Sequence, residues 1–352
     1  MSMLMTKRWR PGALTMVMAG IVIVCGCLTG VGAAAAQESS LAAACWTPEQ
    51  LSGSPEERAK RNLEDGDPVT RAPRRELQSF TPTDHALYGS IRRVHVTDGR
   101  KLVALTFDLC EAGHELAGYD AFIIDTLRAE NVKATFFAGG RWMMDHVERA
   151  EQLMSDPLFE IGNHNWSHAN VRRIDETHTV GEIVKTQLAY EEVRERLSKR
   201  ECVQSQAAAM SRIPQRLGLY RFPYGACNPE ALAAVAAEGL LAIQWDVSMA
   251  DPSPSQTAER ILKEVLAKVR PGSIIIGHAN GRGVHTDEAL PTLIAELKKR
   301  GYDFVTVSEL LAAGKPEITP ECYDEHPGDV NRYDTPQSAG KHLAKPDGPA
   351  KG

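Results

Sequence analysis

The stretch of residues 104–113, ALTFDLCEAG, reads as the end of a buried strand that runs into a polar loop. Its first four residues are apolar or β-branched, which is typical of a strand in a parallel sheet covered on both faces. Asp108 follows directly, and a second carboxylate, Glu111, stands three residues further on. An acidic residue at a strand end either caps a turn or takes part in chemistry, so its role depends on what else the fold brings to that end.

Outward from this stretch, short apolar runs alternate with segments of helical period. The predicted strands are residues 102–107, 134–138, 159–163, 219–222, 240–245, 273–277 and 303–307. The predicted helices are residues 119–130, 146–155, 181–200, 229–238, 257–269, 287–300 and 308–312. Repeated strand-then-helix order indicates an α/β fold in which helices cover a parallel sheet, either a barrel or a doubly wound sheet. Seven strands favour closure into a barrel, with a single catalytic domain over residues 96–315.

The two ends of the chain have a different composition from this central part. Residues 37–95 are polar and rich in Pro, Arg and Glu, which predicts a lead-in or linker. Residues 316–352 have a similar composition and are expected to form a flexible tail. The formal net charge of the whole chain is -6 and no long basic block is present, so we expect no nucleic-acid partner.

Residues 1–36 have the pattern of a secretory signal peptide. Lys7, Arg8 and Arg10 precede a long apolar run, and small residues follow near Ala34 and Ala36. The apolar run is also long enough to be an uncleaved membrane anchor. We therefore expect a secreted or periplasmic protein that contacts a membrane only through this segment, if it is not cleaved.

The cysteine count fits an oxidising compartment, which permits disulfides. If Cys25 and Cys27 leave with the signal segment, five cysteines remain: Cys45, Cys110, Cys202, Cys227 and Cys322. Five is an odd number, so at least one thiol stays free or pairs elsewhere. The sequence does not determine the pairing. Our two guesses are a Cys202–Cys227 bond and a Cys45–Cys322 bond.

Ionisable side chains gather where the predicted strands end. In a β/α barrel the active site lies at the carboxyl ends of the strands. The residues at or just beyond these ends are Asp108, His164, His168, Arg221, Asp246, Asp251 and His278. Turn formation alone would favour Gly, Asn and Ser over His and Arg, so this set predicts a site with chemical activity.

The segment HNWSH places two histidines, His164 and His168, four residues apart. On a helical turn this spacing brings both imidazoles to one face, within reach of one divalent metal ion such as zinc. Such a site needs a third protein ligand. The alternative is two surface histidines that flank Trp166.

Two more strand-end residues fit acid–base catalysis. Asp108 is either a cap or a general base that takes a proton from a metal-bound water. His278 is either a structural histidine of the core or a general acid that protonates a leaving group. A neighbouring carboxylate, Asp251 or Asp246, would raise its pKa and keep it protonated.

The segment YRFPYG contains a cation among aromatic side chains. Arg221 either stacks on a ring at the surface or pairs with Asp108 at the mouth of the barrel, which would hold that carboxylate ionised and oriented. Tyr224 is a candidate for a wall that faces a sugar substrate.

Taken in order, these motifs resemble those of the polysaccharide deacetylases with a NodB-like domain, carbohydrate esterase family 4, over roughly residues 100–312. TFDLCE is similar to the first motif, TFDD, and HNWSH matches the second in both histidines. RFPYG matches the third motif, while WDVSMADP and IIIGHAN are similar to the fourth and fifth. The resemblance implies a distorted (β/α)7 barrel and the hydrolysis of acetyl groups from an acetylated polysaccharide of the cell envelope or the extracellular space.

The resemblance also implies a role for each matched residue and a divalent metal, most simply zinc. The implied roles are base for Asp108, metal ligands for His164 and His168, orientation of the base for Arg221, acid for His278, and tuning of that acid for Asp251.

One position departs from the family pattern. The family takes its third metal ligand from the second aspartate of TFDD, where this chain has Leu109. Glu111 is the nearest carboxylate and is our prediction for the third ligand. Cys110 is a softer alternative, available only if it forms no disulfide. Two further alternatives are that Asp108 itself binds the metal, or that metal affinity and catalysis are both lost.

Two other function classes stay open. The leucine at position 109 motivates a non-catalytic glycan-binding module of the same fold. An amide or cyclic-imide hydrolase of a related barrel type is the other alternative, because such relatives also depart from TFDD.

Overall fold

The strand that contains the opening stretch, β3 (Leu102–Leu109), is buried along its whole length. It pairs in parallel with β5 (Ala134–Ala138) on one side and with β10 (Ile274–His278) on the other. This computed structural model describes residues 40–59, 64–66, 68–73 and 81–335, all of which belong to one compact unit. The predicted signal or anchor segment, residues 1–36, lies outside the described residues.

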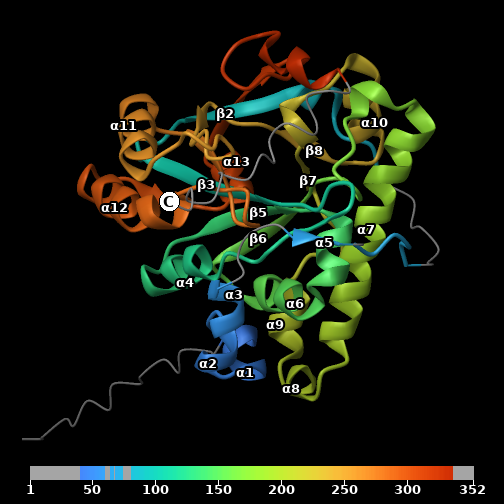
Figure 1. Cartoon of the computed structure of the whole chain (residues 1–352), viewed down its shortest axis with the longest axis vertical. Helices are drawn as coiled ribbons and strands as arrows, with labels where there is room; N and C mark the ends of the chain where they lie inside the picture. The colour runs from blue at the N-terminus through green and yellow to red at the C-terminus, as the bar shows by residue number, and fades with distance from the viewer. Residues whose placement is uncertain (1–39, 60–63, 67, 74–80, 336–352) are drawn as a thin grey trace, which may run out of the picture. The chain divides into compact units, whose positions relative to one another are not determined.

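The sheet around β3 is mixed and strongly curled (Figure 1). Its strands follow one another in the order β12-β2-β8-β7-β6-β5-β3-β10-β9, and β11 pairs with the start of β3. The remaining strands are β1 (Glu64–Asp65), β2 (Ser90–Val96), β4 (Glu115–Leu116), β6 (Phe159–Asn163), β7 (Leu219–Tyr220), β8 (Leu241–Ile243), β9 (Val247–Ser248), β11 (Asp303–Phe304) and β12 (Gly314–Thr319).

The curl brings the two sides of the sheet together through one stretch of chain. β8 and β9 are successive pieces of residues 241–248. β8 pairs with β7, and β9 pairs with β10 on the far side of β3. This arrangement confirms the predicted α/β fold with a distorted barrel. The seventh predicted strand, β11, is reduced to two residues.

Helices follow the parallel strands, as the sequence predicts. They are α1 (Leu41–Cys45), α2 (Pro48–Leu51), α3 (Pro55–Ala59), α4 (Ala121–Ala129), α5 (Gly140–Asp145), α6 (Val147–Ser155), α7 (Glu176–Ser198), α8 (Glu201–Gln204), α9 (Ala207–Arg212), α10 (Pro229–Ala237), α11 (Ala258–Lys268), α12 (Thr286–Lys299) and α13 (Val307–Ala312). Four short 3-10 turns complete the described chain: η1 (His85–Leu87), η2 (Val171–Arg173), η3 (Pro223–Gly225) and η4 (Asp329–Tyr333). Neighbouring helices such as α11 and α12 pack against each other.

Two apolar layers lie on opposite sides of β3, because successive side chains of a strand point to opposite faces. Val103, Leu105, Phe107 and Leu109 belong to the larger core, together with residues of the helices. The alternate positions, such as Leu102 and Ala104, pack inside the barrel with residues of β2, β5, β8 and β10. Asp108 shares this inward face.

Two strands of the main sheet lie mostly outside the predicted domain limits of 96–315. β2 falls almost wholly within the predicted lead-in, and β12 extends from the end of the predicted domain into the predicted tail, yet the two pair with each other. β2 escaped prediction because SIRRVHV carries adjacent charges. Arg92 is nevertheless buried, and its guanidinium donates to the carbonyls of Tyr323 and Asp324.

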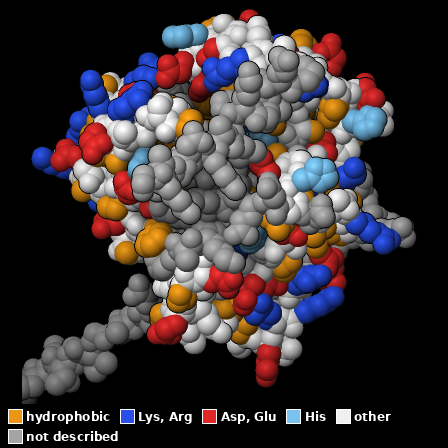
Figure 2. Space-filling view, in the orientation of Figure 1, with side chains coloured by type: hydrophobic (Ala, Val, Ile, Leu, Met, Phe, Trp, Pro, Cys, Tyr) orange, Lys and Arg blue, Asp and Glu red, His pale blue; other side chains and the backbone are white. Residues whose placement is uncertain are grey.

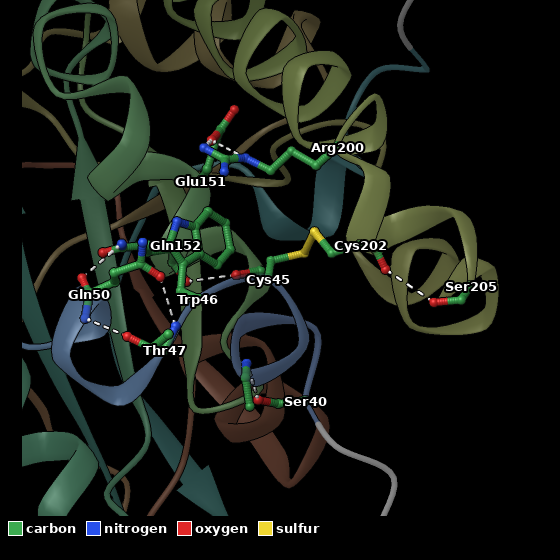
Figure 3. The surroundings of a disulfide bond; sticks show 12 residues. Ser40, Cys45, Trp46, Thr47, Gln50, Glu151, Gln152, Arg200, Cys202 and Ser205 are labelled. Atoms are coloured by element: carbon green, nitrogen blue, oxygen red, sulfur yellow. Dashed lines mark hydrogen bonds and ion pairs between the residues drawn. A yellow bond between two sulfur atoms is a disulfide. The ribbon is translucent and has the colours of Figure 1, made fainter.

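Two disulfides tie chain segments that are distant in sequence. Cys45 pairs with Cys202 and Cys227 pairs with Cys322, so both guessed pairings are wrong, while Cys110 is free and buried. The first bond joins α1 to α8 beside Trp46, on which Arg200 stacks at 4.5 Å (Figure 3). Disulfides of this kind indicate a compartment outside the reducing cytoplasm.

On the face drawn in Figure 2, acidic and basic side chains are interspersed. Among the described residues, no helix has the length and apolar character needed to cross a membrane.

Replacing Cys45 and Cys202 together by serine is expected to lower the free energy of unfolding by about 2–5 kcal/mol, because the bond closes a long loop of the unfolded chain. Urea-induced unfolding, followed by tryptophan fluorescence, measures the loss. Peptide mapping under non-reducing conditions provides the control: recovery of a Cys45–Cys322 peptide instead of Cys45–Cys202 would contradict the pairing.

Candidate functional site

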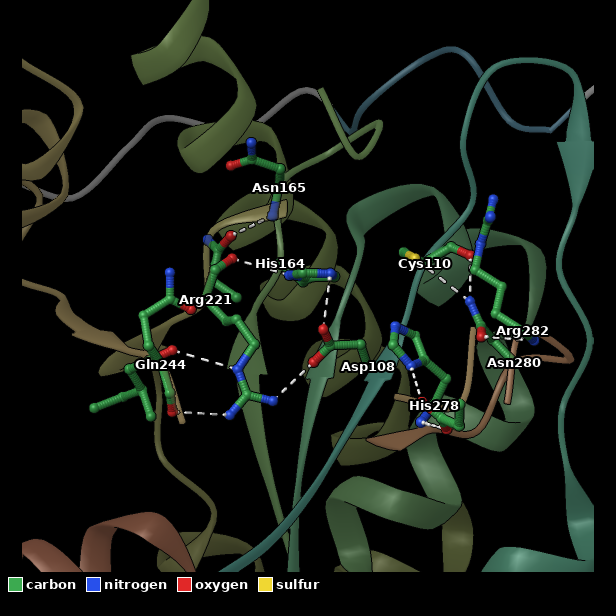
Figure 4. Close-up of polar contacts among 12 residues, drawn as sticks. Asp108, Cys110, His164, Asn165, Arg221, Gln244, His278, Asn280 and Arg282 are labelled. Atoms are coloured by element: carbon green, nitrogen blue, oxygen red, sulfur yellow. Dashed lines mark hydrogen bonds and ion pairs between the residues drawn. The ribbon is translucent and has the colours of Figure 1, made fainter. Parts of the chain in front are cut away.

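A buried ion pair stands where β3 and β7 end. Arg221 Nη1 donates to Asp108 Oδ1 at 2.9 Å, and both side chains are almost completely buried. The guanidinium also donates to the carbonyls of Ile243 and Gln244 (Figure 4). It lies 4.0 Å from the centre of the Phe137 ring. The predicted contact between Arg221 and Asp108 is therefore present, and the arginine is a core residue.

The surroundings of Asp108 favour its ionised form. Burial alone would raise the pKa of this carboxyl, but His164, Arg221 and His278 together lower it below its usual value. The carboxylate thus stays charged and is held in one orientation by the guanidinium.

The two histidines of HNWSH meet through an irregular turn after β6, and not through the helical turn that the spacing suggested. Asn165 and His168 both have positive φ, 63° and 57°. Hydrogen bonds from Tyr220 to the Asn165 side chain, and from that side chain to the Ala169 carbonyl, hold the turn. The centres of the two imidazole rings lie 5.0 Å apart.

Each imidazole keeps one buried nitrogen without a hydrogen bond within the described chain. His164 Nδ1 lies 2.9 Å from the Arg221 carbonyl, which only accepts, so Nδ1 carries the proton and Nε2 is left with its lone pair. His168 Nδ1 is likewise buried and unpaired. Burial lowers the pKa of both histidines, most strongly for His168. Neutral imidazoles with free lone pairs are the form that binds metal ions.

Cys110, not Glu111, completes this group. One ligand atom from each of Cys110, His164 and His168 lies within 4.8 Å of the others. The strand's alternation explains why: Asp108 and Cys110 share the inward face, whereas Leu109 packs into the outer core. Burial raises the pKa of the Cys110 thiol to about 12, and Asn280 Nδ2 lies 3.4 Å from its sulfur.

The Glu111 carboxylate is turned to the other side of the loop. Its Oε1 accepts from the Ala117 N–H at 3.1 Å and lies 3.7 Å from His146 Nε2. Burial raises the pKa of Glu111 to about 7. The structure therefore does not bring the predicted third ligand to the two histidines; Glu111 instead fastens the loop that follows β3.

The last strand-end pair is His278 with Asp251. His278 Nδ1 lies 2.9 Å from Asp251 Oδ1, and Asp251 Oδ2 also accepts from the His278 N–H and from Thr286. Burial alone would lower the pKa of His278, but the neighbouring carboxylate raises it above its ordinary value. Asp246, the alternative partner, binds Ser273 and the Ile274 N–H instead.

A cleft of about 360 Å³ opens beside His168. His168, Tyr224 and the loop residues Ala112 and Gly113 contribute to its walls. Tyr224 has a positive φ of 61°, and its ring lies 4.5 Å from that of His168. The cleft also contains Tyr333, which sequence reasoning missed because it lies in the predicted flexible tail.

Comparisons with known proteins agree on one family. A family profile described as "Polysaccharide deacetylase" matches residues 95–243. A peptidoglycan-N-acetylglucosamine deacetylase of Bacillus cereus is 31% identical over 219 residues, which cover 60% of this chain and 69% of the relative. The peptidoglycan-N-acetylglucosamine deacetylase PgdA of Listeria monocytogenes is 28% identical over 64% of this chain, and the match spans only 42% of that relative's length.

Solved structures give the same answer. The Bc1960 peptidoglycan N-acetylglucosamine deacetylase, in complex with an N-hydroxy-benzamide compound, is 27% identical with a TM-score of 0.52, over 65% of this chain and 96% of that one. BA3943 from Bacillus anthracis, described as a CE4 family pseudoenzyme, is 25% identical with a TM-score of 0.51, over 66% of this chain and 72% of that one.

Replacing Arg221 with methionine is expected to lower the free energy of unfolding by about 3–5 kcal/mol, because it leaves the buried Asp108 charge without its partner. The double variant Asp108→Asn/Arg221→Met is expected to lose less than the sum of the two single changes, since the two residues are coupled. Urea denaturation measures all three. Lys298→Met, which breaks an exposed pair with Glu130, is the control and should cost under about 1 kcal/mol. Strictly additive losses would contradict the coupling.

Proposed function

Since the chain belongs to the polysaccharide deacetylase family, carbohydrate esterase family 4, we propose that it is a metal-dependent hydrolase that removes acetyl groups from a glycan outside the cytoplasm. One observation carries the proposal. Asp108, the Cys110/His164/His168 group and the His278–Asp251 pair lie together at the carboxyl ends of the central strands. Three of the relatives named above are described as peptidoglycan-N-acetylglucosamine deacetylases, so an oligosaccharide of that sugar is the first substrate to test.

The donor set of Cys110, His164 and His168 fits a divalent metal. Two buried imidazole nitrogens without a hydrogen bond and a thiol are a nitrogen–sulfur set that suits zinc, and three protein ligands leave a position open for chemistry. When bound, the ion would polarise the acetyl carbonyl and increase the acidity of water. We propose Cys110 for the third position, in place of Glu111.

The remaining steps fall to the chain's own side chains. Asp108 takes the proton of the water whose oxygen attacks the acetyl carbonyl carbon, and Arg221 holds the carboxylate ionised and in place. His278 gives its proton to the leaving nitrogen or oxygen of the sugar as the bond to the carbonyl carbon breaks, so the products are acetate and a free amine or hydroxyl. Asp251 keeps His278 protonated until that step, and Tyr224 forms part of the wall against the sugar.

A glycan-binding module without turnover is the second candidate. Leu109 stands where the family has its second aspartate, and BA3943, a similar structure, is described as a pseudoenzyme. This candidate predicts binding of the oligosaccharide without release of acetate, whatever metal is supplied.

Acetate release from an N-acetylglucosamine tetrasaccharide by the zinc-loaded protein tests the proposal directly. Asp108→Asn is expected to lower kcat by about 10²- to 10⁴-fold, because the base is lost. The exposed Asp98→Asn serves as the control and should leave kcat unchanged. Tetrasaccharide binding by the wild-type protein with no acetate released would favour the binding module.

Metal content distinguishes the two candidates for the third ligand. Cys110→Ser is expected to weaken zinc binding by more than tenfold, whereas Glu111→Gln should leave it intact, because Glu111 is turned toward Ala117 and His146. Zinc per chain after dialysis, and the thiolate-to-metal absorption of the cobalt-loaded protein, are the measurements. Loss of metal in Glu111→Gln with retention in Cys110→Ser would reverse the assignment.

The pH profile tests the acid. Asp251 raises the pKa of His278, and the acid must be protonated to act, so activity should fall as pH rises through this pKa. In Asp251→Asn that pKa drops, and the alkaline limb of kcat/KM is expected to move to lower pH. Asp246→Asn is the control, because the Asp246 carboxylate accepts hydrogen bonds from Ser273 and from the Ile274 N–H. An alkaline limb that stays in place in Asp251→Asn would exclude His278 as the titrating acid.

A further inference from the structure

The segment after β12 crosses from the edge of the sheet to the cleft. We call residues 320–335 the C-terminal extension; it is the red segment beside β2 in Figure 1. Its start is fixed by the Cys227–Cys322 disulfide. Arg92 donates to the Asp324 carbonyl at 2.7 Å, and Trp245 Nε1 donates to Asp324 Oδ1 at 3.0 Å.

The far end of the extension is fixed to the loop that follows the HNWSH turn. Arg172 forms an ion pair with Asp334 at 2.6 Å and donates to Asn331 at 2.9 Å. Asn170 Nδ2 donates to the Tyr333 carbonyl at 3.1 Å. The backbone at Tyr333 is therefore anchored on the same loop that carries His168.

These anchors place the Tyr333 ring against the ring of Tyr224. The centres of the Tyr333 and Tyr224 rings lie 5.0 Å apart, and those of Tyr224 and His168 lie 4.5 Å apart. The three rings form a row that runs from the cleft to the Cys110/His164/His168 group. Tyr333 is half-buried and lines the cleft. The exposed Arg332 side chain lies over its ring, 4.8 Å from the ring centre, and donates to its hydroxyl at 3.1 Å, so a sugar that stacks on this ring displaces Arg332.

The composition of the cleft suits a neutral, partly apolar ligand. Its walls include Ala112, Gly113, His168, Arg173, Tyr224 and Tyr333. The Ser167 hydroxyl and N–H both donate hydrogen bonds to the Glu182 carboxylate. The Asn170 side chain donates to the Tyr333 carbonyl and accepts from the Arg172 N–H. The exposed Arg173 supplies the charge at the rim. Aromatic faces are therefore the main contact surface, and they pack well against the C–H faces of pyranose rings.

We infer that Tyr333 is a substrate-binding residue that stacks on the sugar ring next to the acetylated one, so that the C-terminal extension selects a glycan chain over a single acetylated sugar. This inference rests on the proposed function. Because the ring is already held by backbone anchors on both sides, little of its freedom is lost on binding. In the proposed function, residues at the ends of β3, β6, β7 and β10 act on the acetyl group. Tyr333 therefore contributes to binding of the glycan chain and not to the chemical step.

Binding and turnover of an N-acetylglucosamine tetrasaccharide test this inference. Tyr333→Ala is expected to raise both KM and the Kd measured by calorimetry roughly tenfold, with kcat, zinc content and hydrolysis of a small aryl acetate unchanged. Tyr333→Trp should keep the affinity and Tyr333→Leu should not, because only the former retains an aromatic face. Tyr88→Ala removes an exposed tyrosine outside the cleft and is the matched control.

The outcomes separate this inference from the proposed function. Acetate release with a KM that does not depend on Tyr333 would overturn the inference and leave the hydrolase intact. Tyr333-dependent tetrasaccharide binding without acetate release would sustain the inference and overturn the hydrolase. If Tyr333→Leu and Tyr333→Trp bind equally well, or if Tyr333→Ala loses zinc and kcat together with affinity, Tyr333 is only a structural support and the inference fails.

Discussion

The site depends on one constraint: Asp108 and Arg221 are buried together, and a buried charge is stable only when it is paired and its hydrogen bonds are satisfied. The guanidinium obtains its further acceptors from Ile243 and Gln244, at the point where the β8–β9 stretch leaves one side of the sheet for the other. The break in that stretch therefore frees the carbonyls that the arginine needs. Closure of the distorted barrel and orientation of the carboxylate are two results of the same local geometry.

The same arginine fixes the neighbouring histidine through its backbone. The Arg221 carbonyl accepts a hydrogen bond from His164 Nδ1–H, which leaves Nε2 with its lone pair, 3.4 Å from Asp108. One residue thus orients the carboxylate with its side chain and sets the histidine tautomer with its main chain. Because parallel strands end at the same edge of the sheet, these groups meet although more than a hundred residues separate Asp108 from Arg221.

The sequence predicted those parts of the site that follow from strand order. Asp108, His164, Arg221 and His278 each end a buried apolar run, so a barrel brings them to one end whatever the loops do. Besides the third-ligand prediction at Glu111, four features escaped prediction, each for a physical reason. The HNWSH spacing suggested a helical turn, but the left-handed backbone at Asn165 is set by contacts with distant residues.

The other three features depend on non-local contacts. β2 reads as polar because its buried arginine is satisfied by carbonyls far along the chain. Disulfide partners depend on the fold, since Cys45 and Cys202 are 157 residues apart. Tyr333 reaches the cleft only because the extension is anchored at both ends. The helices and the strands that follow them were predictable because their periodicity is local.

The departure at Leu109 has a simple geometric meaning in this chain. β3 stays paired with β5 through Leu109, so alternation turns that side chain into the outer core and returns Cys110 to the interior. A carboxylate at position 109 with this register would be buried among apolar groups, at a high cost in free energy. The thiol at the next position, which its raised pKa keeps neutral, is the donor that we propose in place of that carboxylate. Two buried imidazole nitrogens without a hydrogen bond lie beside this thiol, and unsatisfied polar atoms destabilise the folded state. A cation held by the three groups would satisfy both nitrogens, so the arrangement supports the proposed metal site.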